Sequence, residues 1–380
     1  MITDYEIGPV RPPSEATSLL LRVTRNCPWG KCRYCGIYKD LKFSVRPFEE
    51  IKADIDRIMQ YRETILGWLP GGEPYDFGRV MERISFLPEE KEQRYLNVMQ
   101  WMIGGEESVF LQDANTMALS FGKLVKILEY LREKLPGLKR VTSYGRVDSL
   151  AKFSADQFIE LKKAGLDRIH SGFETGSDRV LSLIGKGHTK AMEIETGHNI
   201  KGSGIELSMY YMAGVGGAGL SEENATETAD MIGKADPDIV RIRTYIPKPG
   251  TVLFDDISAG RMTMCTDIEI VREIRTMIEN VVGATGYLFS DSRSDLLEDV
   301  RGSFKTETGK MLSVIDEFSA LEPAARKRYQ IARRMGIVGS ISHMETLGNE
   351  QRNRVEMYLS DLNTEEEFEA FLQKLLRRFI

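Results

Sequence analysis

Three of the four cysteines in this chain, Cys27, Cys32 and Cys35, fall within one short stretch with the spacing C-x4-C-x2-C. Three thiolates in a single loop are typical of a site for zinc or for an iron–sulfur cluster. Structural zinc usually completes its shell with a fourth Cys or His, but Cys265 and all four histidines are remote in the sequence. The absence of a nearby fourth ligand therefore favours a site with an open fourth position, such as a [4Fe–4S] cluster that leaves one iron free for a ligand.

The cysteine loop follows Ser18–Thr24, an apolar run that is expected to form a buried strand. Beyond it, segments typical of strands and amphipathic helices alternate. Further strands are expected at residues 108–112, 140–146, 168–174, 205–212 and 239–246. Six successive βα units predict parallel strands with right-handed crossovers, too few for a closed eight-stranded barrel. The sequence thus predicts an α/β fold, a partial (β/α)6 barrel with the cysteines at a strand's carboxyl end.

Three parts are expected along the chain. Residues 1–14 are rich in proline and are expected to form an extended arm. Residues 15–255 are expected to form the partial barrel, and residues 256–380 a helical C-terminal region. Residues 61–107 are too long for a strand-to-helix connection and predict a helical insertion beside the barrel. Residues 286–293 predict a loop or an edge strand.

Several residues mark helix ends. Thr266 and Thr364 each begin a capping box, and Thr189 and Ser221 are expected to cap the helices that follow them. Gly165 is expected to end a helix in the left-handed conformation.

The first strand, the cysteine loop with Tyr34 just before its last cysteine, and the strand–helix alternation resemble the radical S-adenosylmethionine (SAM) superfamily, in its Elp3/MiaB/NifB-like branch. The resemblance implies a partial barrel over roughly residues 15–255 and a [4Fe–4S] cluster whose free iron binds the amino and carboxylate groups of SAM. Reduction then cleaves SAM to a 5′-deoxyadenosyl radical. The superfamily usually has three residues between the first two cysteines. This chain has four, which we interpret as the mark of a subgroup.

The resemblance also covers the run Gly172-Phe173-Glu174-Thr175-Gly176, because related chains carry a similar motif after the fourth strand. It implies that Glu174 contacts SAM. Gly-Gly-Glu triplets often hold the ammonium of SAM in this superfamily. The two triplets here, at residues 71–73 and 104–106, lie in the wrong places, whereas Asp113 and Asn115 directly follow the second strand.

Parallel barrels place their chemistry at the carboxyl ends of the strands. The residues expected there, as contacts of SAM or substrate, are Tyr34, Asp113, Asn115, Ser143, Arg146, Glu174, Met212, Gly214, Arg241 and Arg243. Tyr34 and the glycine-rich run that contains Gly214 are expected near adenine, although such a run can equally be a plain turn. Arg241 and Arg243 share one side of a strand, so they either enter the pocket and meet a carboxylate of SAM or substrate, or form salt bridges on the outside. Lys186 and His188 either reach the pocket or lie in a solvated loop.

The formal net charge of −6, from 51 basic and 57 acidic residues without a polybasic run, gives nucleic-acid binding no sequence-wide support and leaves only a local basic pocket open. The absence of a long apolar segment or signal peptide argues against a membrane protein and for the cytoplasm. Cys265 is expected to be a small buried hydrophobe.

The resulting hypothesis is a radical SAM enzyme, an oxidoreductase or transferase, acting on a small-molecule or peptide substrate. It would receive its electron from a donor of the flavodoxin or ferredoxin type. The alternative is a non-catalytic iron–sulfur or zinc-binding protein in which the three-cysteine loop is structural.

Overall fold

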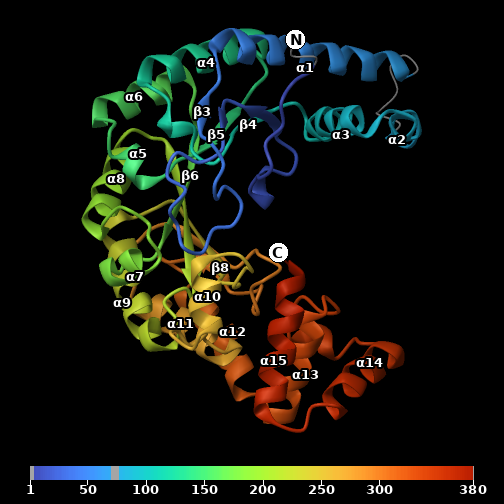
Figure 1. The fold of residues 1–380 in the computed structure, drawn as a ribbon, viewed down its shortest axis with the longest axis vertical. Helices are drawn as coiled ribbons and strands as arrows, with labels where there is room; N and C mark the ends of the chain where they lie inside the picture. Colours follow the sequence, from blue (N-terminus) through green and yellow to red (C-terminus); the bar gives the residue numbers. More distant parts are fainter. Residues whose placement is uncertain (1–3, 70–76, 380) are drawn as a thin grey trace. The chain divides into compact units, whose positions relative to one another are not determined.

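The computed structural model describes residues 4–69 and 77–379, which form two compact units (Figure 1). The first unit comprises Met1–Gly30, Asp40–Ser171 and Asn199–Glu206, and the second comprises Lys31–Lys39, Gly172–His198 and Leu207–Ile380. The triplet at residues 71–73 lies outside the described residues. The predicted boundaries at residues 14 and 255 stay a prediction.

In the first unit the sheet is built from parallel strands in the order β1, β4, β5 and β6. Their bounds are β1 Leu19–Arg22, β4 Ser108–Gln112, β5 Arg140–Tyr144 and β6 Arg168–Glu174, the last of which ends in the second unit. All five residues of β4 are buried, as expected of a parallel strand covered on both faces. The predicted first strand breaks after Arg22, because β2 (Thr24–Arg25) pairs antiparallel with β3 (Ser44–Val45) instead.

Helices flank this sheet, and α3 packs against α1 and β1. Residues 61–68 of the predicted insertion continue α1, so the bounds of the insertion stay a prediction. The helices of the first unit are η1 Pro13–Glu15, α1 Phe48–Trp68, α2 Phe77–Ser85, α3 Glu89–Ile103, η2 Thr116–Ala118, α4 Phe121–Lys134, α5 Val147–Leu150 and α6 Ala155–Ala164. Gly165 ends α6 with a φ of 109°, as predicted.

In the second unit β7 (Glu206–Ala213), β8 (Ile239–Thr244) and β9 (Tyr287–Phe289) run parallel, and β10 (Arg301–Ser303) pairs antiparallel with β9. The segment predicted as a loop or an edge strand thus contains β9, which has a neighbour on each side. The α/β partial-barrel class with mostly parallel strands is confirmed, and β9 and β10 are additions to the six predicted strands.

The second unit also contains the helical C-terminal region, in which α13 packs against α14 and α15 (red in Figure 1). Its helices are α7 Asp178–Leu183, α8 Lys190–Gly202, which ends in the first unit, η3 Ala218–Leu220, α9 Ser221–Ala235, α10 Val252–Ser258, α11 Asp267–Asn280, α12 Thr308–Ala320, α13 Pro323–Arg334, η4 Ser342–Met344, α14 Asn349–Ser360, α15 Glu365–Leu376 and η5 Arg377–Phe379. None of the helices among the described residues has the length and apolar character needed to cross a membrane.

The predicted caps hold with one exception. The capping boxes of Thr266 and Thr364 are present, and the Thr189 hydroxyl accepts a 3.4 Å hydrogen bond from the first turn of α8. Ser221 is the first residue of α9 rather than its N-cap. Its backbone is already helical, with φ −62° and ψ −45°, whereas an N-cap residue is typically extended. Its hydroxyl donates to the buried carboxylate of Glu273 at 2.5 Å.

Candidate cluster and cofactor site

The first half of the cysteine loop is held by Asp113, a fully buried residue directly after β4. Its Oδ2 accepts from Arg22 Nη2 at 2.8 Å and from the backbone N–H of Asn26 at 3.0 Å. Asn26 has a φ of 66°, the left-handed conformation that Asn adopts more readily than most residues. Asp113 therefore fixes the residue that precedes Cys27.

Asn115, also fully buried, organises the neighbouring loop after β5. Its Oδ1 accepts from the backbone N–H of Arg146 at 3.0 Å, and its Nδ2 donates to Ser149 Oγ at 2.8 Å. Arg146 pairs with Asp148 at 2.8 Å, and its guanidinium lies 5.3 Å from the ring centre of Trp29. The loop after β5 thereby contacts the spacer between the first two cysteines.

The second half of the cysteine loop is fixed within the second unit through Arg33. Its backbone N–H donates to Ile184 O at 2.9 Å, and its guanidinium pairs with Asp256 at 2.5 Å. Between the two cysteines of this half, the N–H of Cys35 donates to Cys32 O at 3.2 Å. The end of α7 and the helix α10 thus set the course of the chain through Cys32 and Cys35.

Tyr34, Glu174 and Lys186 form a cluster within the second unit, hereafter the Tyr34–Glu174–Lys186 cluster. Glu174 Oε1 accepts from Tyr34 Oη at 2.9 Å and from Lys186 Nζ at 2.8 Å. The side chains of Lys186 and Glu174 are only 5% and 9% exposed. Burial raises the pKa of the Tyr34 hydroxyl well above its usual value, and the adjacent Glu174 carboxylate raises it further. The sequence left open whether Lys186 reaches the pocket or lies in a solvated loop. In the structure Lys186 is a buried partner of Glu174.

The two glycines of the Gly-Phe-Glu-Thr-Gly run make room for this arrangement. A Cβ on Gly172 would stand 2.2 Å from Glu174 Oε1, and one on Gly176 would stand 2.4 Å from Glu227 O. Glu174 itself has a φ of 73°, a conformation that is costly for a residue other than glycine. The backbone therefore holds the Glu174 carboxylate in place at a cost of roughly 1–3 kcal/mol.

The glycine-rich run after β7 is held by Glu273 of α11, a residue that sequence reasoning missed because it looks like any acidic residue of a helix. The buried Glu273 carboxylate accepts from the N–H of Gly214 at 2.8 Å, from Tyr211 Oη at 2.7 Å and from Asn224 Nδ2 at 2.7 Å. Burial raises the pKa of Glu273. Met212 packs, as Tyr34 does, against a separate apolar cluster. The approach of this run to adenine stays a prediction.

Arg241 and Arg243 of β8 share one carboxylate. Both guanidinium groups pair with Asp291, Arg243 at 2.8 Å, and they lie over the rings of Phe289 and Tyr210 respectively. The side chains of Arg241 and Arg243 are only 8% and 19% exposed, so this ion pair is not the salt bridge on the outside that the sequence left open. Contact of the two arginines with SAM or substrate stays a prediction. Asp291 was not singled out because nothing local distinguishes it from other loop acids.

Three further predicted residues are buried. Ser143 lies within β5 with its hydroxyl 3.5 Å from the carbonyl of Tyr144. His188 Nε2 lies 2.9 Å from Glu193 Oε1, inside the protein rather than in a solvated loop. Cys265 is buried as expected, and burial raises the pKa of its thiol to about 12, so it carries no reactive thiolate.

The donor chemistry of the three loop cysteines fits an iron–sulfur cluster. All three are half-buried thiols free of disulfides. Cys27 belongs to the first unit, whereas Cys32 and Cys35 belong to the second. Over residues 4–69 and 77–379, no three His, Cys, Asp or Glu side chains stand assembled as a metal site. The three cysteines therefore fit an iron–sulfur cluster in their donor type, their burial and their spacing in the sequence.

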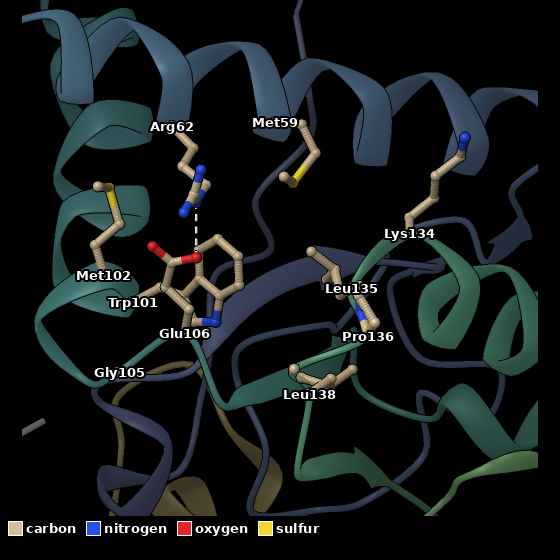
Figure 2. Close-up of a pocket in the computed structure, with 11 residues that line it drawn as sticks. Met59, Arg62, Trp101, Met102, Gly105, Glu106, Lys134, Leu135, Pro136 and Leu138 are labelled. Carbon is tan, nitrogen blue, oxygen red and sulfur yellow. Dashed lines mark hydrogen bonds and ion pairs between the residues drawn. The ribbon is translucent and has the colours of Figure 1, made fainter.

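The cavities in the described part of the first unit include the following two. One, of about 480 Å³, is near the amino end of β4, where the Arg62–Glu106 ion pair of 2.7 Å flanks the indole of Trp101 (Figure 2). The other, of about 620 Å³, is formed by the loops that follow β4 and β5 together with Pro28 and Trp29 of the cysteine loop. The larger cavity thus lies at the ends of the strands where chemistry is expected.

A sequence model of the Radical SAM superfamily matches residues 21–232. Among curated proteins, a tRNA-2-methylthio-N(6)-dimethylallyladenosine synthase of Syntrophus aciditrophicus is 29% identical over 151 residues, covering 38% of this chain and 32% of that protein. An uncharacterized methyltransferase of Pyrococcus horikoshii is 26% identical over 170 residues, covering 44% of this chain and 35% of that protein. The chain thus spans about a third of the length of these relatives.

Among solved structures, the archaeal Elp3 of Methanocaldococcus infernus is 18% identical with a TM-score of 0.42, covering 60% of this chain and 58% of that one. Methylornithine synthase is 14% identical with a TM-score of 0.40, covering 73% and 64%. The superfamily model matches more than half of the chain. The protein therefore belongs to the radical SAM superfamily, whose enzymes use a [4Fe–4S] cluster and SAM.

Proposed function

We propose that this protein is a cytoplasmic radical SAM enzyme in which Cys27, Cys32 and Cys35 hold a [4Fe–4S] cluster. Bound there, the cluster would supply one electron to SAM, yielding methionine and a 5′-deoxyadenosyl radical that abstracts a hydrogen atom from a substrate. The observation that carries the proposal is the loop of three half-buried thiols, none of them in a disulfide, inside the segment that matches the superfamily. The substrate is a small molecule or a peptide, and the electron donor is of the flavodoxin or ferredoxin type.

The Tyr34–Glu174–Lys186 cluster is the proposed SAM contact. SAM carries an ammonium, a carboxylate and ribose hydroxyls, for which a carboxylate and a lysine are complementary partners. A buried Glu–Lys pair contributes little net stability, and strained backbone concentrates at functional sites. Both features are present at Glu174. Tyr34 would present its ring to the adenine while its hydroxyl orients Glu174.

Asp113, Asn115 and Arg146 are proposed as positioning residues, since their partners belong to the cysteine loop or to the loop after β5. Ser143, Met212, Gly214, Arg241 and Arg243 stay predicted contacts of SAM or substrate.

The test is the release of 5′-deoxyadenosine. Protein reconstituted anaerobically with iron and sulfide is incubated with dithionite and SAM, and the product is quantified by liquid chromatography. We expect product from the unaltered protein and none from Cys27→Ala, Cys32→Ala or Cys35→Ala. Cys265→Ala is the matched control, and it should retain both iron and product. A cluster-loaded protein that forms no 5′-deoxyadenosine would overturn the proposal.

A further inference from the structure

The larger cavity of the first unit has the size of a small-molecule site. Its volume of about 620 Å³ falls in the range of about 300–1,000 Å³ that is usual for ligand pockets. It is lined by Pro28, Trp29, Phe43, Met117, Ala118, Leu119, Ser120, Phe121, Asp148, Ser149, Lys152, Phe153 and Gln157.

One wall of this cavity is the spacer that makes the cysteine loop longer than usual. Trp29 lies between Cys27 and Cys32 and lines the cavity. The guanidinium of Arg146 lies 5.3 Å from the Trp29 ring centre and pairs with Asp148 at 2.8 Å. Trp29 is therefore held against the loop after β5 by a cation–π contact.

A second wall is fixed by buried hydrogen bonds. Asn115 holds the backbone of Arg146 and the hydroxyl of Ser149, and both Asn115 and Ser149 are buried. Ser149 lines the cavity directly. The cavity thus has a pre-formed polar wall, a general property of ligand sites.

The lining chemistry selects a class of ligand. Trp29, Phe43, Phe121 and Phe153 provide aromatic rings around the cavity. Its lining carries one Asp and one Lys, so the formal charges of the lining cancel. Asp148, Lys152 and Gln157 add hydrogen-bonding groups. Aromatic walls with balanced charge favour a neutral planar ring that has donors and acceptors on its edge.

The other cavity of the same unit lacks this character. Trp101 is its single aromatic residue, beside the aliphatic or thioether side chains of Met59, Met102, Leu135 and Leu138 (Figure 2). It also lies near the amino end of β4, away from the strand ends that carry chemistry in parallel barrels.

We propose that the larger cavity binds a neutral, planar heteroaromatic ring of the substrate, with Trp29 as a stacking surface. The extra residue between Cys27 and Cys32 would then give the spacer the length to present this indole. That the bound ring belongs to the substrate rests on the proposed function, whereas the binding itself is measurable without turnover.

The test uses quinazolin-4-one as the probe and its fully saturated analogue as the matched non-aromatic control. Binding to the cluster-loaded protein is measured by isothermal titration calorimetry. We expect saturable 1:1 binding of quinazolin-4-one and about tenfold weaker binding of the saturated analogue, because stacking on aromatic residues is lost.

Trp29→Ala should weaken binding of quinazolin-4-one about tenfold. Trp68→Ala, which removes a tryptophan that is not part of the cavity, should leave the affinity unchanged. If Trp29→Ala does not fold, Phe43→Leu keeps an apolar side chain while removing one ring, and a severalfold loss is expected. Equal affinity for the aromatic and saturated probes, or unchanged affinity in the variant that folds, would overturn the ring site.

This outcome is separable from failure of the proposed function. Unaltered protein that releases 5′-deoxyadenosine but does not bind quinazolin-4-one would overturn the ring site alone. Protein that binds the probe but releases no 5′-deoxyadenosine from SAM would overturn the proposed function and, with it, the identification of the ring as substrate.

Discussion

Two buried carboxylates lie at strand ends, Asp113 after β4 and Glu174 at the end of β6. They accept hydrogen bonds from different kinds of donor. Asp113 accepts from Arg22 and from a backbone N–H of the cysteine loop. Glu174 accepts only from side chains in the described contacts, those of Tyr34 and Lys186, and does so from a left-handed backbone. A carboxylate tied to backbone is part of the fold, whereas one held by movable side chains can exchange them for a ligand.

The largest effect is expected for Asp113→Ala, which removes the acceptor of the Asn26 N–H and, among the described residues, leaves Arg22 with Glu6 alone, at 3.7 Å. Breaking a buried charge pair from one side costs about 3–5 kcal/mol. The free energy of unfolding should fall by this order in urea titrations, and less iron should be retained after reconstitution. Asp113→Asn keeps an acceptor and should lose less. If Asp113→Ala is as stable as the parent protein and retains as much iron, Asp113 is not a carboxylate on which the fold depends.

Glu174→Gln comes next and should act on SAM rather than on the cluster. The glutamine keeps an acceptor for Tyr34 but loses the charge that pairs with Lys186 and, in our proposal, with SAM. Charge-assisted hydrogen bonds contribute about 1.5–3 kcal/mol, so the Kd for SAM should rise at least about tenfold. Equilibrium dialysis with labelled SAM measures this, with iron content as the internal control. Parallel loss of iron would make Glu174 a positioning residue like Asp113.

Gly172→Ala tests the packing beneath Glu174. The added Cβ would stand 2.2 Å from Glu174 Oε1, so the carboxylate must move. Such overpacking costs about 1–3 kcal/mol. The cost should shrink in a Glu174→Ala background, because the clashing atom is gone. If the effects of Gly172→Ala and Glu174→Ala on the free energy of unfolding simply add in this double-mutant cycle, the added Cβ does not clash with Glu174.

Tyr34→Phe should have the smallest effect. It removes the hydroxyl that donates to Glu174 but keeps the ring proposed to face adenine. The loss of one hydrogen bond is expected to cost about 1 kcal/mol, or a several-fold rise in the Kd for SAM. If Tyr34→Phe weakens SAM binding as much as Glu174→Gln does, the hydroxyl of Tyr34 contributes more to SAM binding than a single hydrogen bond to Glu174.

Sequence patterns were sufficient where the signal is local. The strand at residues 168–174, the capping boxes of Thr266 and Thr364 and the αL end at Gly165 all match the structure, because apolar runs and cap residues act within a few positions. The class of the fold follows from the repetition of such units.

Partners distant in sequence could not be predicted. Glu273 accepts a hydrogen bond from the N–H of Gly214, and Asp291 forms ion pairs with two arginines. No local sequence pattern distinguishes either acid from other acidic residues. Ser221 looked like a cap, but its backbone is already helical and its hydroxyl donates to Glu273, far away in the sequence. Strands β9 and β10 are too short to give a clear periodicity.

The most direct test of the central claim is the electron paramagnetic resonance spectrum of the dithionite-reduced, reconstituted protein with and without SAM. A cluster held by Cys27, Cys32 and Cys35 has one iron open to SAM, so we predict a reduced [4Fe–4S] signal that shifts when SAM is added and that is missing in Cys27→Ala. A signal that is identical with and without SAM, or a protein that takes up zinc and gives no signal, would contradict the account.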